Sequence, residues 1–152
     1  MDLPNIFTQE VANEVIHRLE KINEETVPVW GKMNAGQMMA HCNVPYEMVF
    51  ENKHPKPGKF TKFLLKIFAK NTVVGTKPYK RNVRTAPAFI IKGNRNFELE
   101  RTRLIEYIDR VQKLGAKSFD QKESNSFGNL SVNEWNNLFY KHLDHHLTQF
   151  GV

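Results

Sequence analysis

The C-terminal segment, residues 131–150, constrains the fold most, because it predicts one amphipathic helix. Ser131 and Glu134 form a capping box, the pattern that begins many helices. At about 100° per residue, counted from Trp135, the apolar side chains occupy an arc from roughly −60° to +120°. An apolar arc of this width has to be buried against other elements, so the segment predicts a helix that packs inside a larger helical fold.

Two histidines of this segment fall inside the apolar arc. On the same count His142 lies at about −20° and His146 at about +20°, whereas His145 lies at about −80°, at the edge of the arc. Histidines four residues apart on one helix face can share a metal ion. Alternatively, both are core histidines, and each ring then needs a polar partner in the interior. The segment by itself leaves both interpretations open.

A third ligand for such a metal has to come from another helix. His41 lies on a second predicted helix, in line with two methionines of its inward face. His17 and His54 are weaker candidates, because the first lies among charged residues and the second in a proline-rich loop. Three neutral imidazoles suit a divalent ion such as zinc or nickel, and they leave positions open for water or substrate. We therefore predict a metal site formed by His41, His142 and His146.

Four more helices are predicted from apolar residues at helical spacing. They cover residues 5–21, 34–51, 59–70 and 96–114. Within the second, Asn34 and Gln37 match a capping box, and Pro45 predicts a bend near His41. We find no convincing strand alternation, and residues 71–95 have no clean period. The sequence therefore predicts an all-α four-helix bundle with an extra short cationic helix and a long crossover loop, as one domain over residues 1–152.

Positive charge is concentrated in one internal segment. Residues 53–92 hold eleven Lys or Arg and no Asp or Glu, while the rest of the chain holds 11 basic and 16 acidic residues. This pattern favours an anionic partner near the segment. Its helix, residues 59–70, has an apolar side and a lysine stripe. Such a helix either lies on acidic lipid, contacts nucleic acid phosphates, or covers the bundle with solvated lysines; no nucleic acid motif accompanies it, so no nucleic acid partner is expected.

Cysteine content and hydropathy predict a cytoplasmic protein. The single cysteine, Cys42, cannot form an internal disulfide and fits a reducing compartment. We expect it to be a small core residue rather than a fourth ligand. No apolar run approaches the roughly 20 residues that a bilayer requires, and we see no secretion signal.

Two stretches of the chain, about a hundred residues apart, resemble the DinB-like (YfiT/DinB) superfamily of metal-dependent four-helix bundles. Residues 30–42, WGKMNAGQMMAHC, are similar to its second-helix motif, in which a glutamine precedes the histidine by four residues. Residues 127–131, FGNLS, with Glu134, Trp135 and residues 142–151, resemble an uncharacterised branch of it. The resemblance implies metal ligation by the same three histidines and pairing into a homodimer. It also implies activities such as thiol-cofactor-dependent S-transfer or maleylpyruvate isomerisation.

The leading hypothesis is therefore a metal-dependent enzyme, a thiol-dependent S-transferase or a related hydrolase or isomerase. Its substrate would be a small, anionic molecule, with a low-molecular-weight thiol as cosubstrate; the sequence identifies no catalytic residue. Gln37 either contacts a ligand or caps its helix, and the cap is favoured. Arg101, on an apolar helix face, either binds an anionic substrate or pairs with a buried acid, which is favoured. The alternative is a non-enzymatic module that binds an acidic membrane or nucleic acid through residues 53–92.

Overall fold

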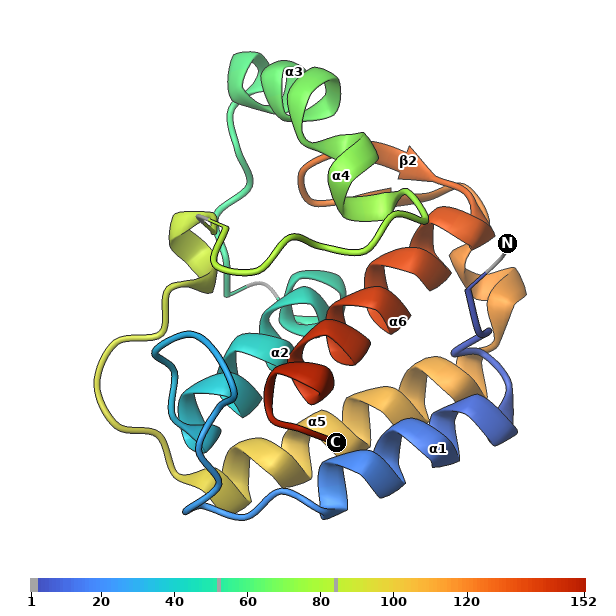
Figure 1. The fold of residues 1–152 in the computed structure, drawn as a ribbon. Helices are drawn as coiled ribbons and strands as arrows, with labels where there is room; N and C mark the ends of the chain where they lie inside the picture. The colour runs from blue at the N-terminus through green and yellow to red at the C-terminus, as the bar shows by residue number, and fades with distance from the viewer. Residues whose placement is uncertain (1–2, 52, 84) are drawn as a thin grey trace.

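The computed structural model describes residues 3–51, 53–83 and 85–152, and the chain is mostly helical (Figure 1). The α-helices are α1 (Gln9–Glu20), α2 (Ala35–Phe50), α3 (Lys59–Phe68), α4 (Lys70–Val74), α5 (Phe97–Leu114) and α6 (Val132–Gln149). Two short 3-10 helices, η1 (Pro87–Phe89) and η2 (Ala116–Phe119), and two strands, β1 (Lys122–Ser124) and β2 (Gly128–Leu130), complete the fold. Among the described helices, none is long and apolar enough to cross a membrane.

Side-chain caps fix the starts of the helices that matter for the site. Asn34 and Gln37 form the predicted capping box of α2, and Ser131 and Glu134 form that of α6. In each box the N-cap side chain accepts a backbone N–H that the helix leaves unpaired. The α2 helix continues through Pro45 to Phe50. These starts set the registers of α2 and α6, and therefore the directions in which their histidines point.

Four long helices contact each other in a ring: α1 and α2 each contact both α5 and α6. In Figure 1, α1 lies along α5, and α6 lies beside α2. The α2 and α6 helices are antiparallel, since Tyr46 stacks on Phe139 with ring centroids 4.8 Å apart while the earlier His41 meets the later His142. The aromatic core therefore occupies one half of this interface and the histidines the other.

The region between α5 and α6 corrects the prediction of a fold without strands. β1 and β2 pair antiparallel, with Lys122 opposite Leu130, and Gly128 takes a positive φ of 76° beside the turn. The hydroxyl of Ser124 accepts the backbone N–H of Phe127 across that turn (2.8 Å). Strands of three residues are too short to produce a detectable alternation, which is why the sequence pattern missed them.

The connection from α2 to α5 is long, as predicted, and it is fastened at two places. The ammonium group of Lys141 on α6 donates to the carbonyls of Thr72, Gly75 and Lys77. At the other end, the amide of Gln37 donates to the carbonyl of Gly93 (3.1 Å). We call residues 75–96 the crossover segment; its residues Tyr79 and Phe89 lie against histidines of α2 and α6.

Candidate metal centre

Three buried histidines meet at the interface of α2 and α6. His41 comes from α2, and His142 and His146 come from successive turns of α6, with 5%, 9% and 7% of their surfaces exposed. One ring nitrogen of each lies within 4.8 Å of one nitrogen of both others. The small residual exposures place the cluster just below the surface. These are the three residues that both the helical wheel and the inward face of α2 predict as a group.

Hydrogen bonds fix the tautomers of two of the rings. Nδ1 of His41 lies 2.8 Å from the carbonyl oxygen of Phe89, and because a carbonyl only accepts, this nitrogen carries the proton. Nδ1 of His146 donates in the same way to Oε1 of Gln149 (2.8 Å). The amide of Gln149 is oriented for this role, since its Nε2 donates to the carbonyl of Trp30 (2.8 Å). Both rings therefore keep a lone pair on Nε2, the atom that a metal would need.

The third ring, His142, has a different environment. Its Nε2 lies 3.0 Å from Nε2 of His41. Its Nδ1 is buried, and within residues 3–51, 53–83 and 85–152 no group forms a hydrogen bond with it. A buried ring nitrogen without a partner is costly, and native proteins contain few of them. The only hydrogen bond of this ring within the described residues is therefore the one between its Nε2 and His41.

Burial keeps the cluster neutral. Desolvation lowers the pKa of His146 to about 3 and that of His142 well below its ordinary value of 6.5. The pKa of His41 is also lowered, mainly by burial, although its bond to Phe89 acts in the opposite direction. The positive charge of any one ring would also repel the others. Three neutral imidazoles are the protonation state that binds a metal at neutral pH.

The geometry fits a single ion of the first transition series. At a metal–nitrogen distance of about 2.0–2.1 Å, two ligand nitrogens lie about 3–3.5 Å apart. The 3.0 Å separation between His41 and His142 matches this value, and all three ligand nitrogens lie within 4.8 Å of one another. Two of the three rings already have the carbonyl-type partner on Nδ1 that orients histidine ligands.

Aromatic side chains surround the three rings. Phe89 of the crossover segment lies edge-on to His41 and His142, with centroid distances of 5.4 and 5.9 Å. Tyr79 lies edge-on to His142 and His145 (6.5 and 5.5 Å). The half-buried His145 lies between Tyr79 and Trp30, outside the three-histidine group, as its place at the edge of the arc predicts. These rings restrict the access of water to the centre.

The other histidines and the cysteine lie elsewhere. Nε2 of His54 is 2.7 Å from a carboxylate oxygen of Glu47, and His17 is exposed beside Glu20. Cys42 is fully buried in the core, which raises the pKa of its thiol, and its sulfur lies 3.7 Å from that of Met38. The thiol therefore has the surroundings of a core residue.

The two residues predicted to contact substrate have other partners. Gln37 accepts the backbone N–H of Asn34 (3.1 Å) and donates to Gly93, so it caps α2 and holds the crossover segment. Arg101 lies on α5, 2.6 Å from a carboxylate oxygen of Glu98, an acid that is exposed rather than buried. A role of either residue in substrate binding stays a prediction.

Sequence reasoning missed the groups that support the histidines. Gln149 follows His146 by three residues on the same helix, and this spacing could have suggested a contact. The carbonyl of Phe89 and the buried Lys141 leave no comparable signal, because their partners lie far along the chain: 48 residues for Phe89 and His41, and 64–69 for Lys141 and the carbonyls that it contacts.

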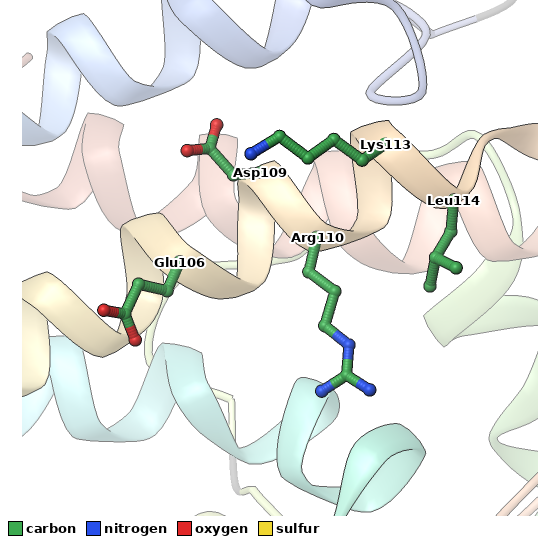
Figure 2. A pocket seen from close by; sticks show the side chains of 5 residues that line it. All are labelled: Glu106, Asp109, Arg110, Lys113 and Leu114. Carbon is green, nitrogen blue, oxygen red and sulfur yellow. The ribbon is translucent and has the colours of Figure 1, made fainter.

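A hollow on the outer surface of α5 lies apart from the histidines. It has a volume of about 350 Å³ and is lined by residues of one helix, including Glu106, Asp109, Arg110 and Lys113 (Figure 2). The guanidinium of Arg110 lies over the ring of Phe50 on α2, 4.1 Å from its centroid. The lining carries acidic and basic groups in equal number, so it favours neither an anionic nor a cationic ligand.

Comparison with known proteins adds a family without a known activity. A family model described as "Protein of unknown function (DUF1569)" matches residues 5–151. No curated protein and no solved structure matches the chain significantly. The matched region includes the three histidines together with Phe89 and Gln149.

Proposed function

The chain belongs to the family described as "Protein of unknown function (DUF1569)", and we propose that it is a metal-dependent enzyme. In this proposal His41, His142 and His146 bind one divalent transition metal, zinc or nickel, as the three protein ligands. The observation that carries it is the convergence of three buried, neutral imidazoles, two of which have Nδ1 occupied by an acceptor. Such a set leaves positions open to a substrate, as in catalytic rather than structural sites.

The proposed reaction is thiol-dependent S-transfer, the conjugation of a small thiol to an electrophile, or else a related hydrolysis or isomerisation. A divalent ion held in this way lowers the pKa of a bound thiol or water and so supplies a nucleophile at neutral pH. The protein orients His41 through the carbonyl of Phe89 and His146 through Gln149. The surrounding rings of Tyr79 and Phe89 exclude bulk water, which strengthens electrostatic interactions in the site.

An anionic substrate is favoured by the charge of the crossover segment. The guanidinium of Arg81 lies over the ring of Trp30, 4.1 Å from its centroid, and Trp30 in turn contacts His145. The charge of Arg81 lowers the pKa of His145, although burial is the larger cause. A carboxylate or phosphate approaching the centre from this side would meet that positive charge. We therefore propose that Arg81 binds the anionic group of the substrate or of a thiol cosubstrate.

The proposed architecture is a four-helix bundle of DinB-like type. The ring of contacts among α1, α2, α5 and α6 supports it, as does the position of the histidines on two facing helices. A cytoplasmic location and a homodimer belong to the same proposal, and sedimentation of the purified protein tests the homodimer.

Elemental analysis of tag-free protein tests the metal, with a matched pair of histidine variants. We expect about one metal per chain in the unaltered protein, loss of the metal in His142→Ala, and retention in His145→Ala, since His145 lies outside the group. Retention of metal by His142→Ala, or equal loss in both variants, would overturn the assignment. Turnover is tested separately: the metal-loaded protein is incubated with several small thiols and electrophiles, and no conjugation with any of them would contradict the S-transferase.

A further inference from the structure

The α3 helix presents an apolar face that the rest of the chain does not cover. None of its residues is buried, and its apolar side chains keep large exposed fractions: Phe60 74%, Phe63 59%, Leu64 37%, Ile67 55% and Phe68 77%. At about 100° per residue, counted from Lys59, these five side chains span from about 40° to about 180°. Leu65, which packs against the core, lies at about 240°. The exposed face is therefore contiguous and points away from the body of the molecule.

Lysines flank this face on one side. On the same count Lys59, Lys66 and Lys62 lie at about 0°, −20° and −60°, directly beside the apolar arc. These three lysines, with Phe63, Phe127 and Gly128, line a groove of about 280 Å³ between α3 and the β1–β2 hairpin. Lys62 is paired with Glu123 of β1 (2.6 Å). Within the described part of the chain, Lys59 and Lys66 form no such ion pair and carry free positive charge.

We propose that α3 docks this protein on an acidic lipid bilayer. The apolar side chains enter the boundary between head groups and acyl chains, while Lys59 and Lys66 contact the anionic head groups at the groove. In Figure 1, α3 lies at the edge of the molecule, apart from the four long helices, so a flat surface can reach it.

Charge favours this partner over a second copy of the chain. A copy that packed the same face antiparallel against α3 would bring its own lysines against Lys59 and Lys66, and like charges at close range repel. The anionic head groups of an acidic bilayer would instead attract these two lysines.

The apolar face also favours lipid over nucleic acid as the partner. Phosphate binding by lysines does not require five exposed apolar side chains, whereas partition into a bilayer does. Among the described helices none can span a membrane, so the docking is peripheral.

Cosedimentation with vesicles tests the proposal on the full-length protein. Vesicles of phosphatidylcholine are compared with vesicles in which about 30% of the lipid is phosphatidylserine, at an ionic strength of about 0.15 M. We expect the protein to pellet with the acidic vesicles and not with the neutral ones, and the bound fraction to fall as salt is raised. Absence from the acidic pellet overturns the proposal, and so does equal binding to both kinds of vesicle.

Substitutions of exposed residues on α3 test the docking without disturbing the fold. Lys59→Gln with Lys66→Gln is expected to weaken binding about 25-fold, about fivefold for each lysine. Phe60→Ser with Phe68→Ser is expected to weaken it about 100-fold or more, because each ring adds at least about tenfold by burial. Matched controls are Val27→Ser, at a side chain that is 78% exposed, and the exposed Lys117→Gln; both are expected to bind as the unaltered protein does.

Two further outcomes would assign the face to another partner. If duplex DNA binds with the same dependence on Lys59 and Lys66 while the vesicles do not bind, the lipid proposal is wrong. If Phe60→Ser with Phe68→Ser converts a dimer into a monomer in sedimentation, the face is an interface between copies. The metal content of these variants is expected to equal that of the unaltered protein, so this test is independent of the metal centre.

Discussion

Gln149 offers the sharpest test of how the metal centre is held. Its Oε1 accepts the proton on Nδ1 of His146, and its Nε2 donates to the carbonyl of Trp30, both at 2.8 Å. The side chain is 95% buried, so water does not easily replace it. Gln149→Leu keeps approximately the same volume but removes both hydrogen bonds. His146 then loses the acceptor that fixes its tautomer and its ring orientation.

The magnitude follows from the role of such partners in metal sites. Loss of a hydrogen-bond partner behind a histidine ligand lowers metal affinity about 10–100-fold. This factor corresponds to about 1.4–2.7 kcal/mol of binding free energy. Folding also becomes less favourable, because the buried Nδ1 of His146 loses its partner at about 1–3 kcal/mol, and the half-buried carbonyl of Trp30 loses its partner at a smaller cost. The two effects have to be measured separately.

The Gln149→Glu variant distinguishes the effect on metal affinity from the effect on folding stability. A carboxylate still accepts from Nδ1 of His146 but donates nothing to Trp30. This variant is therefore expected to lose stability and to keep metal affinity within a few-fold of the unaltered protein. Affinity is measured by competition with a chromophoric chelator, and stability by thermal unfolding followed by circular dichroism. Gln9→Leu, which replaces an exposed glutamine on α1, is the matched control. Affinity of Gln149→Leu within twofold of the unaltered protein would refute the reasoning, as would equal weakening by Gln149→Glu.

Two further predictions concern stability. Because burial lowers the pKa of His146 to about 3 and that of His41 below 6.5, the unfolded chain takes up protons on these rings before the folded chain does. The free energy of unfolding of chelator-treated protein is therefore expected to fall by up to about 1.4 kcal/mol per pH unit for each ring as the pH is lowered from about 7 to about 5, and the Tm is expected to fall with it; an unchanged Tm in this window contradicts the burial argument. Gly31→Ala is expected to cost about 1–2 kcal/mol in thermal unfolding, because φ is +88° and the new Cβ would overlap Nε2 of Gln149. Gly58→Ala, at an open position, is its control, and equal Tm changes in the two variants would contradict the clash.

The predictions that the structure confirms rest on local patterns. The capping boxes of α2 and α6 involve residues three apart, and the 3.6-residue period identifies the buried face of α6. Because His142 and His146 lie on that face and His41 lies on the inward face of α2, their convergence follows once the two helices pack. The grouping of the three histidines could therefore be predicted from the sequence.

What the sequence could not provide depends on contacts between distant segments. The charge of residues 53–92 suggests a free cationic surface, yet part of it is neutralised by acids elsewhere: Lys62 by Glu123 and Lys70 by Glu134. Arg84 of that segment lies outside the described residues. Lys141, in the middle of α6, would be expected at the surface, but it is buried because it donates to the carbonyls that end α4. Neither pairing has a local signature, since each partner lies dozens of residues away.

The structure also allows the core-histidine interpretation to be weighed against the metal. A core histidine is stable when both of its ring nitrogens have partners. Without an ion, Nε2 of His142 can donate to Nε2 of His41, and Nδ1 of His142 has no partner in the described part of the chain. One such buried nitrogen costs about 1–3 kcal/mol. An ion shared by the three rings would use every Nε2 lone pair at once, while Nδ1 of His142 would still lack a partner. The three rings therefore do not satisfy one another fully as core side chains, and their grouped Nε2 atoms could hold a metal.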